Sequence, residues 1–178
     1  MIKITFDTNC ILRDEKDKNK YYNQIKILEQ LEKKGLIEIH RADATDTEID
    51  GFNSRLKKSS EFKEDLGIGV YDNSRYDHCV YAGPSDEDEF NDLKQRSGFN
   101  NLKNISEKKK KNKLKDLMIL HTHKKMGHNY LISNNIKDFI FDLLNINLIN
   151  PEKLDSNKID TINTENELIN YFDERKEK

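Results

Sequence analysis

The chain has 178 residues, of which 36% are charged and 34% are hydrophobic, and its formal net charge is −2. A chain of this length fits a single domain that buries a real core. The near balance of acids and bases excludes a generally basic nucleic-acid coat protein, although it leaves room for a local basic groove. No apolar run approaches the ~20 residues of a membrane helix, and the first residues do not read as a signal peptide. We therefore expect a cytoplasmic protein with no membrane partner.

The two cysteines and the five histidines form no recognisable zinc motif. Cys10 and Cys79 are not part of a CxxC pair, which favours two reduced thiols. His121 and His123 lie two positions apart in a predicted helix. They do not share a helix face, so they are not expected to bind a metal together.

Four elements are predicted in the first third of the chain. Residues 2–6 alternate apolar and polar side chains, which predicts a strand. The helical spacing of apolar residues over 21–34 predicts a helix that stops at Gly35. Residues 36–40 are predicted as a second short strand, and a helix is expected to open near Thr45.

The rest of the chain divides into a polar middle and a periodic second half. From about 51 to 112 we expect an insertion of two or three polar helices around an irregular segment. Thr164 and Glu167 fit a capping box, which predicts a terminal helix. The elements predicted after the insertion are a helix at 113–127, a strand at 129–133, a short helix at 138–144, a strand at 146–150 and a helix at 164–178.

Strands that alternate with helices predict an α/β fold with a parallel sheet. In such a sheet, ligands bind beyond the carboxyl ends of the strands. Asp7 directly follows the first strand, and Asn134 and Asn135 follow the third in the same way. Because parallel strands bring equivalent ends together, we expect these residues to converge despite their separation in sequence.

Four acids occupy positions that suit a metal site. Asp7 follows the first strand, Glu48 comes soon after the second, Asp116 is near the start of a helix and Asp138 follows the third strand. Clustered carboxylates repel one another, so they need a cation between them. Hard oxygen ligands suit Mg²⁺ or Mn²⁺, and such an ion can activate water and stabilise the transition state of phosphodiester hydrolysis.

Each of these acids also has a simpler interpretation, and both interpretations stay open. Asp7 could cap the turn after its strand. Thr45 and Glu48 fit a capping box. Asp116 could be one more charge on a charged helix, and Asp138 could favour a helix start through its negative charge.

The same residues resemble the motifs of the PIN-domain nucleases, in the order and at the approximate spacing of that family from residue 1 to about 154. The chain departs from the family at Asn135, where the family often carries Asp, and in the longer span between Glu48 and Asp116. The four matching segments are "FDTNCIL", "TDTEID", "KDLMILHTHKKMGHNYLISNNIKDF" and "INLINPEKL".

The resemblance implies a PIN-like three-layer α/β/α sandwich with a central, mostly parallel sheet. The nuclease domain would span 1–154, including a polar helical insertion at about 51–112, and a C-terminal extension with a helix would follow at 155–178. The implied activity is that of a Mg²⁺- or Mn²⁺-dependent endoribonuclease. Small members of the family are commonly toxins of toxin–antitoxin pairs and homodimers. RNA, an antitoxin protein and a second copy are therefore the implied partners.

The resemblance also implies roles for individual side chains. Asn9 and Ser133 would support the site. Asn135 has no charge, so we favour Asp138 as the fourth acid and expect Asn135 to position water or phosphate. The residues with implied catalytic and metal-binding roles are Asp7, Glu48, Asp116 and Asp138.

A run of basic residues leads directly to Asp116. One interpretation is a solvated helix face, and the other is a strip that binds RNA phosphates beside the site. The residues of the run are Lys108, Lys109, Lys110, Lys111 and Lys113.

Two other function classes stay open. One is a PIN-like module with weak or lost catalysis that binds RNA or serves assembly, and Asn135 is its best support. The other is an α/β phosphatase-like or receiver-like domain in which Asp7 accepts phosphate as a nucleophile, with Ser133 available as the hydroxyl partner.

Overall fold

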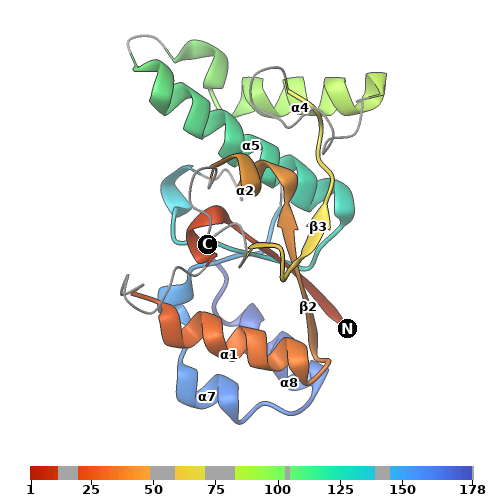
Figure 1. Cartoon of the computed structure of the whole chain (residues 1–178), viewed down its shortest axis with the longest axis vertical. Coiled ribbons are helices and arrows are strands. Elements are labelled where there is room, and N and C mark those ends of the chain that lie inside the picture. The colour runs from red at the N-terminus through yellow and green to blue at the C-terminus, as the bar shows by residue number, and fades with distance from the viewer. Residues whose placement is uncertain (12–19, 49–58, 71–82, 103–104, 139–144, 178) are drawn as a thin grey trace.

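Figure 1 shows the computed structural model of the chain. The residues that the structure describes are 1–11, 20–48, 59–70, 83–102, 105–138 and 145–177.

The centre of the fold is a five-stranded sheet with the order β3-β2-β1-β4-β5, in which every described strand pair is parallel. Thr5 of the central strand lies opposite His40 on one side and Leu131 on the other. The strands are β1 (Ile2–Phe6), β2 (Ile37–Ala42), β3 (Lys63–Asp65), β4 (Tyr130–Ile132) and β5 (Leu148–Ile149).

Helices cover both faces of this sheet, as Figure 1 shows, so the architecture is a three-layer α/β/α sandwich. On one face lie α1 (Tyr22–Lys33), α7 (Ser156–Asp160) and α8 (Glu165–Asp173). On the other face lie α2 (Asp43–Glu48), α4 (Pro84–Arg96) and α5 (Glu107–Met126). The predicted α/β fold with a parallel sheet is confirmed. Four short 3-10 helices complete the described elements: η1 (Thr8–Cys10), η3 (Phe99–Asn101), η4 (Ile136–Asp138) and η5 (Pro151–Lys153).

Alternation along β1 divides its side chains between two cores. Ile4 and Phe6 face α1 and α8 in the first core, whereas the neighbouring Thr5 faces α5. The first core therefore joins the N-terminal strand to the C-terminal helices. Its fully buried members include Ile2, Ile4, Phe6, Ile25, Leu28, Ile39, Ile159, Leu168 and Phe172.

Local signals explain several helix ends. The Thr164 side chain accepts from the Glu167 N–H, and the Glu167 carboxylate accepts from the Thr164 N–H, so the predicted capping box at the start of α8 is confirmed. Helix α5 starts at a Ser106 cap and ends at Gly127, whose φ of 64° lies in the left-handed region that favours glycine.

The structure differs from the predicted elements in four places. The middle segment contributes the edge strand β3 as well as helices, and α5 begins at Glu107, inside the predicted insertion. Helix α2 begins at Asp43, so Thr45 lies within it and is not its cap. Helix α7 was not predicted. Most of the predicted helix at 138–144 lies outside the described residues.

Among the helices of the described residues, none combines the length and the apolar character that crossing a membrane requires.

Candidate functional site

The strand order places a topological switch point beside β1. The chain leaves β1 towards β2 and β3 on one side, and later returns to β4 and β5 on the other. In open α/β sheets, ligands bind in the crevice at the carboxyl ends of such neighbouring strands. Asp7 directly follows β1 and Ser133 directly follows β4, so both stand at this point.

Asp7 is held there by donors from both strand ends. It is only 2% exposed. Its Oδ1 accepts from the Thr8 N–H at 2.7 Å, and its Oδ2 accepts from Ser133 Oγ at 2.6 Å and from Asn9 Nδ2. These donors offset part of the cost of burying a carboxylate.

Two further contacts tie the two strand ends together, and a third lies within the loop after β4. Asn9 Nδ2 lies 3.3 Å from Ser133 Oγ, and the Asn134 N–H donates to Asn9 Oδ1 at 3.4 Å. The Asn135 N–H donates to Ser133 Oγ at 2.9 Å. The predicted convergence of these two loops is therefore observed, and we call Asp7, Asn9, Ser133 and Asn135 the Asp7 cluster.

Cys10 lies next to this cluster as a buried free thiol. Its Sγ donates to Asn9 Oδ1 and to the Ile132 carbonyl, each at 3.3 Å. Burial raises the pKa of the Cys10 thiol, and the negative charge of Asp7 raises it further. The thiol is therefore neutral at physiological pH. Cys79 lies outside the described residues.

Asp116 is buried on α5, which crosses the same end of the sheet. The later part of α5 reaches β1, where His123 Nδ1 lies 2.8 Å from Thr5 Oγ1. Asp116 lies seven residues earlier, about 10 Å back along the helix axis towards the start of α5, and α5 as a whole packs on α2 and β2. Figure 1 shows this crossing, with the head of β2 pointing towards α2 and α5. Asp116 is therefore on the carboxyl-end side of the sheet, as the Asp7 cluster is.

The backbones of the other two predicted acids lie near the same edge. Glu48 is the last residue of α2, a helix that packs against both η1 and α5. Asp138 is the last residue of η4, and this short helix begins directly after Asn135. The side chains of both acids lie outside the described part of the chain.

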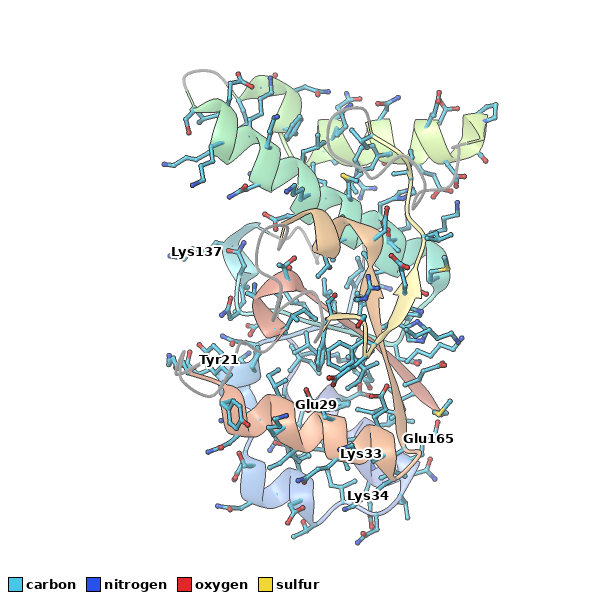
Figure 2. All side chains as sticks on the ribbon, viewed as in Figure 1. Tyr21, Glu29, Lys33, Lys34, Lys137 and Glu165 are labelled. Carbon is cyan, nitrogen blue, oxygen red and sulfur yellow. The ribbon has the colours of Figure 1, made fainter. Side chains whose placement is uncertain are left out.

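Basic side chains extend from the same region. Lys137 of η4 points into solvent, as Figure 2 shows. In the predicted lysine run, Lys113 is half-buried and the members before it are exposed, on the first turns of α5. This exposure is compatible with both interpretations of the run.

Asp43 is a buried carboxyl at this edge that sequence reasoning missed. It starts α2 directly after β2, and its Oδ1 accepts from the Gly67 N–H at 3.0 Å. Within the described residues, its buried Oδ2 has no hydrogen-bond partner. Burial raises the pKa of Asp43 to about 6, although hydrogen bonds from the backbone N–H groups of Gly67 and Ala44 act in the opposite direction.

This raised pKa predicts a pH-dependent contribution to stability. The folded state holds the Asp43 proton up to about pH 6, whereas the unfolded state releases it near 3.9. The contribution of this group to the free energy of unfolding therefore falls as pH rises between these values, by about 3 kcal/mol. Asp43→Asn keeps an acceptor for Gly67 and cannot ionise. Relative to wild type, we expect it to gain stability between pH 4 and pH 7.5 in urea denaturation.

The matched control is Asp155→Asn, because Asp155 caps α7 through the Asn157 N–H and Asn also caps helices well. A gap between Asp43→Asn and wild type that does not change with pH would contradict the prediction.

A second group of titratable side chains lies on the α5 side of the sheet. His40, Asp65 and His128 each offer one ligand atom, and these atoms lie within 4.8 Å of one another. All three residues are buried, and together they could hold a metal ion. We call them the His40 cluster.

Sequence reasoning missed this cluster because its members lie on three separate elements. His40 is in β2, Asp65 in β3, and His128 in the turn before β4. The available signal was a histidine at the end of an apolar stretch predicted as a buried strand. A buried histidine of this kind is most often paired inside the core, so the signal alone does not indicate a metal.

Comparison with protein-family models, with curated proteins and with solved structures found no match for this chain. Inference about function therefore depends on the chemistry of these two groups and on the fold that holds them.

Proposed function

We propose that this protein is a metal-dependent ribonuclease that hydrolyses RNA phosphodiester bonds at the Asp7 cluster. The observation that carries the proposal is a buried carboxylate at the topological switch point, hydrogen-bonded to Ser133 from the neighbouring strand end. A buried carboxylate with this support is a suitable anchor for a cation, and the crevice beside it is where α/β proteins bind substrates.

The donor set fits a hard divalent ion, Mg²⁺ or Mn²⁺. Asp7, Asp116, Glu48 and Asp138 would hold it through carboxylate oxygens, which are the ligands such ions prefer. When bound, the ion supplies charge stabilisation for phosphodiester hydrolysis and lowers the pKa of a coordinated water.

The other members of the Asp7 cluster have positioning roles. Ser133 and Asn9 orient the Asp7 carboxylate by donating to Oδ2. The Asn135 N–H fixes the Ser133 hydroxyl, and we propose that the Asn135 amide positions water or phosphate. Lys137 and the lysine run at the start of α5 would attract the RNA backbone.

The resemblance of the chain to PIN-domain nucleases supports the same reading. Its motifs supply Asp7, Glu48, Asp116 and the segment around Asn135, and the three-layer fold is the one that the resemblance implies. On this basis we propose an endoribonuclease of the cytoplasm that acts as a homodimer and is the toxin partner of an antitoxin protein.

A phosphotransfer function at Asp7 is the second candidate. A receiver domain has the strand order 2-1-3-4-5, with β1 beside β3. Here β1 lies between β2 and β4, which disfavours the receiver-like form. A phosphatase-like form would use Asp7 as the nucleophile. Both Asp7 oxygens already accept hydrogen bonds, so an attacking oxygen would first have to release its donor.

A catalytically weak RNA-binding module is the third candidate, supported by Asn135 in place of an acid.

The test is RNA cleavage by the purified protein. We expect cleavage of single-stranded or structured RNA with Mn²⁺ or Mg²⁺, and none with excess EDTA, because the acids alone cannot bind the phosphate. RNA that is bound but stays intact with either ion would favour the weak module. Trapping of an aspartyl-phosphate on Asp7 would favour the phosphatase-like form.

A further inference from the structure

We propose that the His40 cluster is a separate metal site that takes a borderline transition-metal ion of the Zn²⁺ class. The ligand atoms would be His40 Nδ1, one oxygen of Asp65 and His128 Nε2. The proposal does not depend on the nuclease function, since none of these residues belongs to the Asp7 cluster.

The distances fit the edges of a small coordination polyhedron. His40 Nδ1 lies 3.0 Å from Asp65 Oδ1, and His128 Nε2 lies 3.5 Å from Asp65 Oδ2. Ligand atoms about 2.0–2.2 Å from a tetrahedral Zn²⁺ are about 3.3–3.6 Å apart. The His128 contact has this spacing and the His40 contact is slightly shorter, so small side-chain shifts would bring one Asp65 oxygen and both ring nitrogens around an ion. The rings of His40 and His128 are 4.2 Å apart between centroids, so the two imidazoles are close neighbours.

The hydrogen bonding of the cluster is incomplete where a cation would complete it. Within the described residues, Asp65 Oδ2 is buried and lacks a hydrogen-bond partner. Asp65 Oδ2 lies 3.5 Å from His128 Nε2, in a contact that lacks hydrogen-bond geometry. A buried carboxylate oxygen without a donor is costly, and an ion at this position would remove the cost.

Thr5 orients the His128 ring in the way that metal-binding histidines require. Thr5 Oγ1 lies 2.8 Å from His128 Nδ1 and 2.8 Å from His123 Nδ1. One hydroxyl donates only one proton, so one of these histidines must donate its N–H to Thr5 and the other must accept. If His128 donates, its Nε2 carries a lone pair directed at Asp65, which is the tautomer of a metal ligand.

Glu38 contacts the outer ring nitrogen of His40, as Thr5 contacts that of His128. Its carboxylate lies beside His40 Nε2, so it can take that N–H once Nδ1 binds the ion. A histidine between a metal and a carboxylate is a recurrent arrangement in zinc proteins. Both proposed histidine ligands therefore have an outer partner on the ring nitrogen that faces away from Asp65.

The pKa values of the buried histidines around Asp65 are shifted in different directions. Burial lowers the pKa of His128 to about 4 and that of His123 to about 3, so both are neutral at physiological pH, as ligation requires. Burial acts to lower the pKa of His40, but hydrogen bonds to Asp65 and Glu38 outweigh it and the pKa is raised. The ion would displace the proton that His40 shares with Asp65.

The ligand types also select the ion. Two imidazoles and one carboxylate match Zn²⁺, Co²⁺ or Ni²⁺, whereas Mg²⁺ prefers oxygen ligands alone. The bound ion would join β2, β3 and the turn between α5 and β4. Strand β3 has three residues and lies at the sheet edge, so it is the element that gains most from such a cross-link.

The test uses Co²⁺ as a coloured substitute for Zn²⁺ in the full chain after EDTA treatment and dialysis. We expect saturable visible absorption of a four- or five-coordinate ion at one equivalent per chain, displaced by Zn²⁺ and retained in excess Mg²⁺. Asp65→Asn and His128→Gln should each weaken Co²⁺ binding at least ~10-fold. His121→Gln is the matched control, because His121 is a buried histidine of α5 packed on Phe90 and outside the cluster.

Asp7→Asn tests whether the His40 cluster is independent of the proposed nuclease site. This variant should leave the Co²⁺ spectrum unchanged. Absence of saturable absorption, binding that survives in both cluster variants, or loss of binding in Asp7→Asn would each overturn the proposal. If the cluster variants do not fold, proton NMR of the wild-type Co²⁺ form decides. Two exchangeable, paramagnetically shifted imidazole N–H signals are expected, and their absence overturns the proposal.

Discussion

Replacing Asp7 by Asn is expected to lower metal-dependent RNA cleavage by at least about 100-fold, because even residues behind the ligands of a metal typically change activity by 10–100-fold. The substitution removes the negative charge at the switch point and keeps the shape of the side chain. Asn offers one acceptor oxygen where the carboxylate offers two. Either the Thr8 N–H, which donates to Oδ1, or the two donors to Oδ2, Ser133 and Asn9, lose their acceptor. We therefore also expect a stability loss of about 1–3 kcal/mol, which urea denaturation separates from the loss of activity.

Asp155→Asn is again the control, since it makes the same chemical change at another turn. It should cleave RNA as the wild type does. A folded Asp7→Asn protein with near-wild-type cleavage would remove the Asp7 cluster from the mechanism. Mn²⁺ calorimetry on Asp7→Asn and Asp116→Asn adds an independent readout, and unchanged affinity in both would contradict a shared ion.

Phe172→Ala is expected to give the largest loss of stability, about 3–5 kcal/mol, because it empties a fully enclosed site in the first core. Phe172 is 0% exposed, and its ring meets Tyr130 edge-on at 5.0 Å between centroids. The free energy of unfolding from urea denaturation measures the effect. At Met126, which is 38% exposed, truncation to Ala should change stability by less than about 0.5 kcal/mol.

A small loss for Phe172→Ala would mean that α8 is only loosely attached to the sheet. The packing argues otherwise, because Phe172 and Leu168 share one core with Ile4 of β1. The same packing predicts that residues from 155 onwards stabilise the strand that carries Asp7.

The elements that were predicted well are those with a strong local pattern. Alternation in β1, the helical spacing of α1 and the cap of α8 each specify structure within a few residues. The convergence of Asp7 with the residues after β4, predicted for Asn134 and Asn135, followed from one general property, that parallel strands align their carboxyl ends. No detailed knowledge of the sheet order was needed for it.

The elements that were missed lack such a pattern. Strand β3 is three residues long and its sequence, Lys63 to Asp65, is charged throughout, so hydrophobic alternation is absent. The His40 cluster is assembled by the register of β2 against β3 and by the end of α5, which is tertiary information. The raised pKa of Asp43 likewise comes from burial under Gly67 and α5, and a sequence does not report burial directly.

The central position of β1 has a consequence for the order in which the protein is made. β1 is synthesised before the other strands of the sheet, yet its second neighbour, β4, begins only at Tyr130. The Ser133 hydroxyl that holds Asp7 is 126 residues away along the chain. On a ribosome, β1 and β2 can pair early, but one edge of β1 stays open until the last third of the chain emerges. The Asp7 cluster therefore cannot assemble until the segment that carries Ser133 has emerged, and any activity located there begins only after that point.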